Sequence, residues 1–332
     1  MRLSTIASAA RKGVAAGLLA LGLVAAPVAH AAEPLRIGYS DWPGWVAWQV
    51  AIEKGWLKEA GVDAKFEWFD YSASMDAFSA GKLDAVTCTN GDALVMAGNG
   101  AKNVMIMLTD YSNGNDMIVG KPGVKTLADL KGKKVGLEVG LVEHLLLIHG
   151  LTKIGLKETD VTLVNAKTNE TPQVLASGDV AAVGAWQPIA GQAMKAAAGA
   201  KPLYTSADVP GLIYDVVTVS PASLASRRAE WIKFVGVWDK VVAYIEDPKT
   251  QPDAVAIMAA KVGIDVPTFT RFLKGTKLMT LAEGRKVMKD ADGFGSLYGS
   301  TRFADAFNVK VDVYKTAQDV KAAIDPALTD GK

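Results

Sequence analysis

The 332-residue sequence has one cysteine, Cys88, so no disulfide can form within the chain. Neither sign of charge is in strong excess, because 36 Lys and Arg stand against 35 Asp and Glu. Without a basic excess, nucleic acid is not an expected partner. Beyond residue 31 no apolar run approaches the about 20 residues that a transmembrane helix needs. We therefore expect the rest of the chain to be soluble.

The first 31 residues have the pattern of a secretory signal peptide. Arg2, Arg11 and Lys12 precede an uncharged apolar stretch from Val14 to Ala29, and a small-residue cleavage pattern follows. We expect cleavage after residue 31, and no cysteine stands there to carry a lipid. Removing this segment leaves 33 basic against 35 acidic residues.

The pattern along the chain predicts an α/β protein with two lobes. Short apolar runs alternate with helical patterns, as in βαβ units and parallel sheets. After residue 221 we expect only amphipathic helices, with no strand between them. The expected lobes are residues 32–115 with 216–332 and residues 116–215, joined by crossings near 113–119 and 214–218. The expected strands are 35–39, 64–69, 85–89, 104–108, 116–119, 134–137, 161–164, 181–185, 202–204 and 214–219; the expected helices include 46–60, 74–80, 127–131, 143–154, 226–246, 251–261, 267–273 and 280–290.

Several motifs resemble the nitrate/sulfonate/taurine type of ABC-transporter solute-binding protein. The resemblance rests on Ile37-Gly38-Tyr39 and on the segments 53–57, 80–85, 127–136 and 185–188. A more specific set, at 39–45, 69–74 and 110–116, resembles the subgroup of urea or guanidine transporter substrate-binding proteins. This resemblance implies the type II periplasmic binding protein fold, with two hinged lobes and two parallel-type sheets. It also implies a periplasmic location and an ABC permease with its ATPase as partners.

The segments just after the predicted strands indicate the sign of the ligand's charge. In open α/β sheets ligands lie beyond the carboxyl ends of the strands. The segments chosen there hold eight acids and no Lys or Arg, whereas a desolvated anion needs such partners or helix N-terminal hydroxyls. The family's anion binders carry Gly-Ser or Gly-Thr where this chain has Gly140-Leu141. The eight acids are Asp41, Asp70, Asp92, Asp110, Asp116, Glu138, Glu143 and Asp215.

Carboxylates with aromatic rings suit a planar cation such as guanidinium, held at its edge by the acids and at its face by the rings. The candidate ligand-binding residues are Asp41, Trp42, Tyr71, Asn90, Asp110, Glu138, Trp186 and Asp215. Structural roles compete at several of these positions. Asp41 could cap a helix, Asn90 could begin a turn and a helix, and Asp215 could fix a hinge.

Other functions stay open at this point. The ligand could be neutral urea, or an anion of the sulfonate or nitrate type. An enzyme related to thiamine-pyrimidine synthesis is a further alternative, but we find no Ser-His-Asp order, no Cys-His pair near strand ends and no cluster of metal ligands. We therefore expect a monomeric binding protein with no catalytic residue, no metal and no cofactor.

Overall fold

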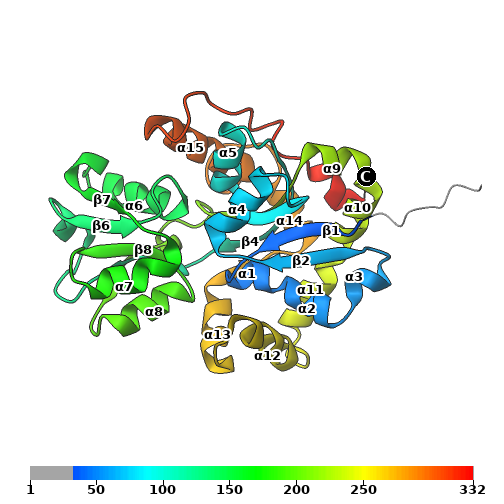
Figure 1. The fold of residues 1–332 in the computed structure, drawn as a ribbon, viewed down its shortest axis with the longest axis horizontal. Coiled ribbons are helices and arrows are strands. Elements are labelled where there is room, and N and C mark those ends of the chain that lie inside the picture. The colour runs from blue at the N-terminus through cyan, green and yellow to red at the C-terminus, as the bar shows by residue number, and fades with distance from the viewer. Residues whose placement is uncertain (1–32, 332) are drawn as a thin grey trace, which may run out of the picture. The chain divides into compact units, whose positions relative to one another are not determined.

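Two β-sheets organise the chain in the computed structural model, which describes residues 33–331 (Figure 1). The predicted signal peptide lies outside these residues. From Pro34 onward the chain forms one compact unit. Strands β6, β7 and β8 group at the left of Figure 1, and β1, β2 and β4 group nearer its centre. The predicted α/β architecture with two sheets is confirmed.

The first sheet has six strands in the order β11-β4-β10-β3-β1-β2. Its parallel part consists of β1, β2 and β3, while β10 runs antiparallel to both β3 and β4. The strand bounds are β1 (Leu35–Tyr39), β2 (Ala64–Trp68), β3 (Ala85–Thr89), β4 (Val104–Ser112), β10 (Tyr214–Val219) and β11 (Thr276–Leu278).

The second sheet has five strands in the order β7-β6-β8-β5-β9. Strands β6, β7 and β8 are parallel, and β5 runs antiparallel to its neighbours β8 and β9. The strand bounds are β5 (Asp116–Gly120), β6 (Lys134–Leu137), β7 (Thr162–Asn165), β8 (Ala182–Trp186) and β9 (Lys201–Thr205).

Both sheets are therefore mixed, and the prediction of two parallel-type sheets is wrong in this respect. The reversed strands β5 and β10 each follow a connection from one sheet to the other, at 113–115 and 206–213. Such a connection contains no crossover helix of the kind that makes neighbouring strands parallel. The exact lobe boundaries stay a prediction. Asp215, which the predicted boundary assigns to the second lobe, lies on β10 in the first sheet.

Helices cover both sheets, and the predicted long helix at 46–60 is divided into three. Gly55, in the left-handed region with φ of 71°, separates the second and third pieces. The predicted helix at 127–131 is a 3₁₀ turn. The α-helices are α1 (Pro43–Val46), α2 (Trp48–Glu53), α3 (Trp56–Glu59), α4 (Tyr71–Ser79), α5 (Asn90–Gly98), α6 (Val142–Lys153), α7 (Thr171–Ala176), α8 (Ile189–Ala196), α9 (Pro221–Ser226), α10 (Arg228–Gly236), α11 (Trp238–Glu246), α12 (Gln251–Val262), α13 (Val266–Lys274), α14 (Leu281–Val287) and α15 (Leu297–Lys310). The 3₁₀ turns are η1 (Leu127–Leu130), η2 (Glu158–Asp160), η3 (Thr168–Glu170), η4 (Ser206–Asp208) and η5 (Pro326–Asp330).

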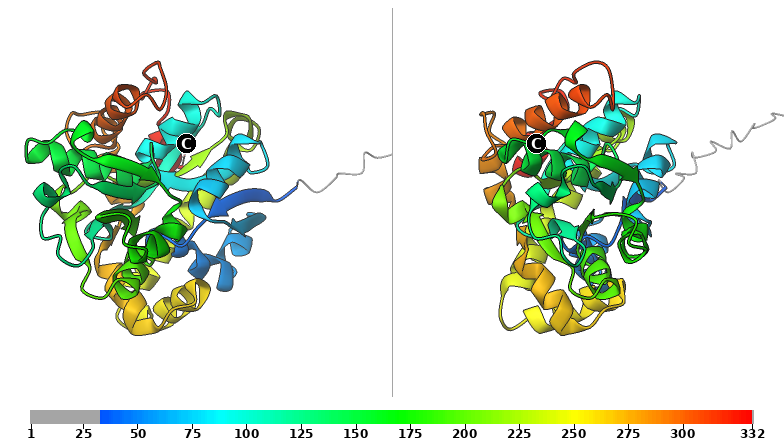
Figure 2. Two further views of the ribbon diagram at one scale, coloured as in Figure 1. Left: turned by 60° about the vertical axis from the view of Figure 1, so that its left-hand side comes forward. Right: turned by 90° about the vertical axis from the view of Figure 1, so that its left-hand side faces the viewer.

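The region after residue 221 is helical except for one short strand. Strand β11 pairs with β4 and forms the edge of the first sheet, so the prediction of a strand-free C-terminal region is wrong there. Helix α15 returns to pack against α5, and the orange α15 and cyan α5 lie close together in Figure 2. No helix within residues 33–331 is long and apolar enough to cross a membrane.

Aromatic packing joins helix α2 to α10 and α11 and to strand β2, where Phe66 packs against Trp48. Trp48 on α2 is fully buried and stacks on Phe234 with ring centroids 4.4 Å apart. Trp238 packs against the same indole at 4.8 Å. Such large rings bury enough apolar surface to fix the position of the helices on the sheet.

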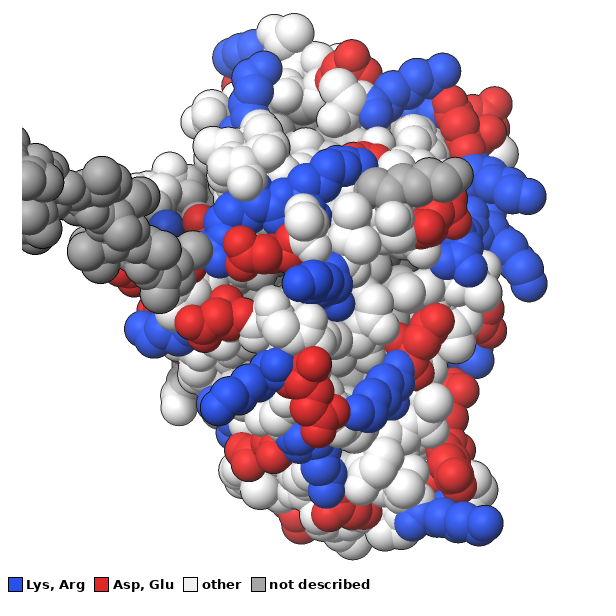
Figure 3. Space-filling model, turned by 90° about the vertical axis from the view of Figure 1, so that its right-hand side faces the viewer, with Lys and Arg blue, Asp and Glu red and all other residues white. Residues whose placement is uncertain are grey.

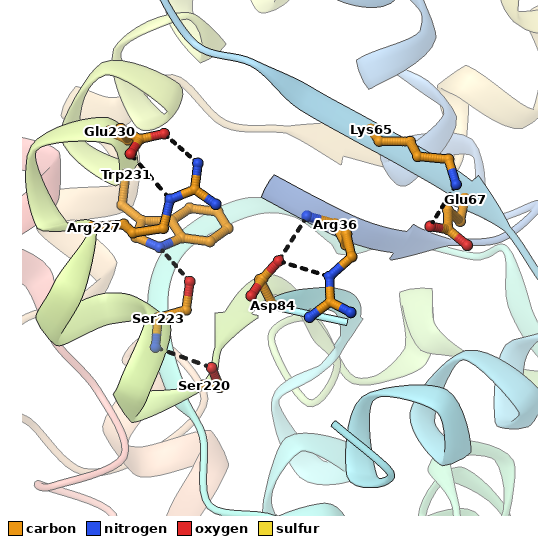
Figure 4. Close-up of polar contacts among 9 residues, drawn as sticks. All are labelled: Arg36, Lys65, Glu67, Asp84, Ser220, Ser223, Arg227, Glu230 and Trp231. Atoms are coloured by element: carbon orange, nitrogen blue, oxygen red, sulfur yellow. Dashed lines mark hydrogen bonds and ion pairs between the residues drawn. The ribbon is translucent and has the colours of Figure 1, made fainter. Parts of the chain in front are cut away.

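Charged side chains on the outer surface pair locally. Figure 3 shows acidic and basic groups intermixed over one face. Figure 4 shows two of these pairs: Arg36 donates to Asp84 at 3.2 Å, and Arg227 Nε donates to Glu230 at 3.0 Å. The buried acids described below differ from these, because their neighbours are other acids.

Candidate functional site

A small pocket lies where strand ends of the two sheets face each other. Its volume is about 50 Å³. Four of the predicted ligand-binding residues line it: Asp41, Tyr71, Glu138 and Trp186. The first sheet's side also supplies Trp68, Phe69, Asp70 and Ser72, and the second sheet's side supplies Lys167, Thr168, Asn169 and Ile189.

Three hydrogen bonds join the two sides of the pocket. Ser72 Oγ donates to Glu138 Oε1 at 2.9 Å, and Trp186 Nε1 donates to Asp41 Oδ1 at 3.2 Å. Asn169 Nδ2 donates to Asp70 Oδ2 at 3.0 Å. Each bond joins a residue after a first-sheet strand to one on the side of the second sheet, so these contacts bridge the pocket.

Tyr71 and Trp186 form the aromatic wall of the pocket. Their rings meet edge to face, with centroids 5.0 Å apart, and Tyr71 also stacks on Trp45 at 5.2 Å. Tyr71 is the first residue of α4, and its hydroxyl donates to Asp92 Oδ2 at 2.6 Å. Both rings are buried, and Tyr71 is fixed by its contacts with Trp45 and Asp92.

The pKa values of two pocket carboxyls, Asp41 and Glu138, are raised. Burial raises the pKa of Asp41 to about 6, although the hydrogen bond from Trp186 opposes the shift. Burial also raises the pKa of Glu138, while bonds from Ser72 and Thr168 lower it. Thr168 Oγ1 donates to Glu138 Oε2 at 3.1 Å, so both carboxylate oxygens have a donor.

One basic side chain also lines the pocket. Lys167 follows β7 and is exposed, and its charge lowers the pKa of Glu138. The expectation of a cleft wall without Lys or Arg is therefore wrong at this position. The segments chosen from the sequence omitted the loop after β7, although the strand-end rule applied to the predicted strand at 161–164 identifies it.

Trp42, Asp110 and Asp215 lie behind the pocket wall and do not line the pocket. Trp42 is buried, and its Nε1 donates to Asp110 Oδ1 at 2.9 Å. Asp215 lies beside Asp110 in the β10–β4 register, and its Oδ2 has no hydrogen-bond partner among the described residues. Burial raises the pKa of Asp110 to about 7 and that of Asp215 well above its usual value.

Asn90 is separate from the pocket and acts as a structural link. Its Nδ2 donates to Ser300 at 3.1 Å and to Thr301 at 3.0 Å, both on α15. Its Oδ1 accepts from the backbone N–H of Tyr214 at 3.1 Å. These bonds join α5, α15 and β10, and Asn90 lines a second, smaller cavity of about 10 Å³.

Several pocket residues were missed among the sequence candidates. Ser72 and Thr168 supply the donors to Glu138, while Asp70 and Asn169 bridge the rim. A hydroxyl or amide side chain has no distinctive pattern in one sequence, so only its place after a strand could have indicated it.

Within residues 33–331 no group of three or more His, Cys, Asp or Glu is arranged to hold a metal ion.

The fold and the pocket define the structural class of the protein. Two mixed sheets with a pocket at their strand ends give the chain a periplasmic binding protein fold. The alkanesulfonate-binding protein SsuA from Xanthomonas axonopodis pv. citri has this fold, with a TM-score of 0.74 at 18% identity over 89% of this chain and 99% of that one. The desulfurization enzyme DSZB has it too, with a TM-score of 0.61 at 16% identity over 89% and 97%. The fold therefore includes both binders and enzymes.

Sequence comparison places the chain more narrowly. The pattern of the family described as NMT1/THI5 like matches residues 42–251, so the chain belongs to the NMT1/THI5-like family. A Brucella abortus (strain 2308) protein named as a binding protein is 27% identical over 301 residues, or 88% of each chain. The narrower resemblance to urea or guanidine binders stays a prediction.

Proposed function

We propose that this protein is the periplasmic binding component of an ABC importer and that its ligand is a small planar cation, with guanidinium the best fit. The observation that carries the proposal is the charge of the pocket. Asp41, Asp70 and Glu138 line it against one lysine, Lys167. Guanidinium and carboxylates form charge-assisted, bidentate hydrogen bonds.

The size of the pocket supports a ligand of few atoms. Its volume is about 50 Å³, and one water-sized group needs roughly 10–15 Å³ on the same measure. The pocket therefore holds about four such groups, which matches the one carbon and three nitrogens of guanidinium. The aromatic wall of Tyr71 and Trp186 offers ring surface to the face of the same cation.

A bound cation would stabilise the ionised form of the pocket carboxyls. Asp41 is partly buried, and its pKa is raised to about 6, so its ionised form lacks sufficient stabilisation in the ligand-free protein. A cation beside it supplies that stabilisation. Neutral urea satisfies donors and acceptors but leaves the negative charge uncompensated.

An anion is the second candidate, because Lys167 lines the pocket and one structural neighbour is named for alkanesulfonate binding. Lys167 is exposed and lies near Glu138, whose charge offsets its own. An oxyanion in the pocket would meet three carboxyl groups for each lysine, so we favour the cation. Export through the signal-like N-terminus and delivery to a membrane permease complete the proposal.

A thermal-shift panel tests the sign of the ligand's charge. The purified protein is melted with millimolar guanidinium chloride, urea, taurine or sodium nitrate, each against sodium chloride at equal ionic strength. A ligand at a hundredfold excess over its dissociation constant stabilises the fold by about 2.7 kcal/mol, so we expect guanidinium alone to raise the melting temperature. Stabilisation by taurine or nitrate without guanidinium would overturn the cation proposal.

A pair of variants locates the binding site. Glu138→Gln removes a pocket charge and should weaken guanidinium binding, whereas Lys167→Gln removes the opposing charge and should strengthen it. The control Glu246→Gln changes an exposed carboxylate on α11, outside the pocket, and should leave the affinity unchanged. For an anion ligand, Lys167→Gln weakens binding instead, so this variant separates the two candidates.

A further inference from the structure

Five buried acids lie behind the pocket wall, each on a different element. Their side chains are at most 3% exposed. Among residues 33–331 none of the five takes part in an ion pair. Isolated buried carboxylates are costly, so most of these groups must hold a proton or share one. The five are Asp92 on α5, Asp110 on β4, Asp116 on β5, Glu143 on α6 and Asp215 on β10.

Four of these acids lie as two neighbouring pairs. Asp215 stands opposite Asp110 in the β10–β4 register, and Glu143 neighbours Asp116, whose charge raises the pKa of Glu143. Asp110 accepts hydrogen bonds from Trp42 and Thr109, whereas no described residue donates to Glu143 Oε1 or Asp215 Oδ2. Burial and the neighbouring acids raise the pKa of Glu143 and Asp215 well above their usual values, so these two residues are expected to hold the protons.

The proton-holding residues also have oxygens without a hydrogen-bond partner. Glu143 Oε1 and Asp215 Oδ2 are both buried and unpartnered in the described part of the chain. Glu143 fits closely over Gly184 on β8, because a Cβ built at that glycine would lie 2.7 Å from Glu143 Cβ. The missing side chain at Gly184 therefore leaves room for Glu143, and no basic residue in the described part of the chain pairs with it.

The pocket wall connects these pairs to the ligand position. Tyr71 lines the pocket and donates to Asp92, and Trp186 lines it and lies opposite Asp116 in the β5–β8 register. Asp41 lines the pocket beside Trp42, which donates to Asp110. Tyr71 and Trp186 thus link the pocket to Asp92 and Asp116, and little solvent screens a charge across these buried rings.

Resting on the proposed cation function, we propose that Glu143 and Asp215 select the charge of the ligand by holding protons in the ligand-free protein and releasing them to solvent when a cation enters the pocket. The other titratable groups that face the pairs are Tyr71, Cys88 and Asp92, with Glu138 at the pocket. A cation favours the ionised acids and so displaces a proton to bulk water. A neutral or anionic guest offers no such compensation, and the protons stay in place.

Direct proton counting tests this inference. Guanidinium chloride is titrated calorimetrically into the purified protein at pH 6.5, in phosphate and in imidazole, whose ionisation enthalpies differ. The difference in binding heat gives the number of protons released, and we expect about 0.5 to 1 per guanidinium. The affinity should rise with pH by up to tenfold per unit for each proton released, because binding and deprotonation are linked.

Variants assign the release to the two acids. Glu143→Gln and Asp215→Asn should each reduce it, whereas the exposed control Glu246→Gln should not. Guanidinium binding with equal heats in both buffers would overturn the inference while leaving the proposed function standing, and this comparison needs no variant to fold. Absence of any guanidinium binding would overturn the proposed function and the inference with it.

Discussion

Replacing Asp92 by Asn should change how the stability of the ligand-free protein depends on pH. Asp92 is 2% exposed, and its Oδ2 accepts a hydrogen bond from the Tyr71 hydroxyl. Its backbone N–H donates to Thr89 Oγ1 at the start of α5. Burial raises the pKa of the Asp92 carboxyl from 3.8 to about 7, although the hydrogen bond from Tyr71 lowers it. The folded state therefore binds this proton more tightly than the unfolded chain does.

The sign and the size of the effect follow from linkage. A raised carboxyl pKa contributes stability at low pH that is lost as the pH rises from the unfolded value through the folded one. For a shift from 3.8 to about 7, this single group lowers the free energy of unfolding by roughly 2–3 kcal/mol between pH 5 and pH 8. The amide introduced by Asp92→Asn cannot titrate, so this variant should lack the loss.

Differential scanning calorimetry is the suitable assay, because urea and guanidinium are themselves candidate ligands. A change of 2–3 kcal/mol corresponds to a shift in melting temperature of about 4–12 °C in a domain of 150–250 residues, and to less in a longer chain. The melting temperature of wild type should fall relative to that of Asp92→Asn as the pH rises from 5 to 8. Equal falls in both proteins, with Glu246→Gln also unchanged from wild type, would refute the assignment of this proton to Asp92.

Two further substitutions test the packing behind the pocket. A Cβ at Gly44 would lie 1.9 Å from Asp110 Oδ2, so Gly44→Ala should destabilise the protein by about 1–3 kcal/mol. The control Gly236→Ala, where a Cβ would meet no atom within 4 Å, should be neutral or slightly stabilising. Calorimetric melts of the two variants beside wild type measure the difference. Trp42→Phe removes the indole donor to Asp110 and should cost about 1–3 kcal/mol at pH 8, and less at pH 5, where Asp110 is protonated. A cost independent of pH would contradict an ionised Asp110 as the acceptor.

The strands could be predicted from the sequence because their signal is local. Short apolar runs bounded by turn residues gave all the strands except β11, to within a few residues at most ends. Strand β11 has three residues, Thr276–Leu278, and its partner β4 lies far away in the sequence, so no local pattern indicates the pairing. The antiparallel direction of β5 and β10 also depends on where the chain crosses between sheets, which no local pattern contains.

The site was predictable only where a strand end reaches the pocket directly. Asp41 and Trp186 follow or end strands and line the pocket, as the strand-end rule predicts. Trp42, next to Asp41, instead turns inward to Asp110, because the short helix α1 directs it behind the wall. Asn90 bonds to α15, more than 200 residues away in the sequence, and nothing near Asn90 indicates that partner.

A crystal structure of the protein with bound guanidinium tests the central claim most directly. We expect one planar ligand in the pocket, its nitrogens within hydrogen-bond distance of the Asp41 and Glu138 carboxylates and its face against Trp186. An oxyanion in that place, held by Lys167 and the hydroxyls of Ser72 and Thr168, would contradict the claim.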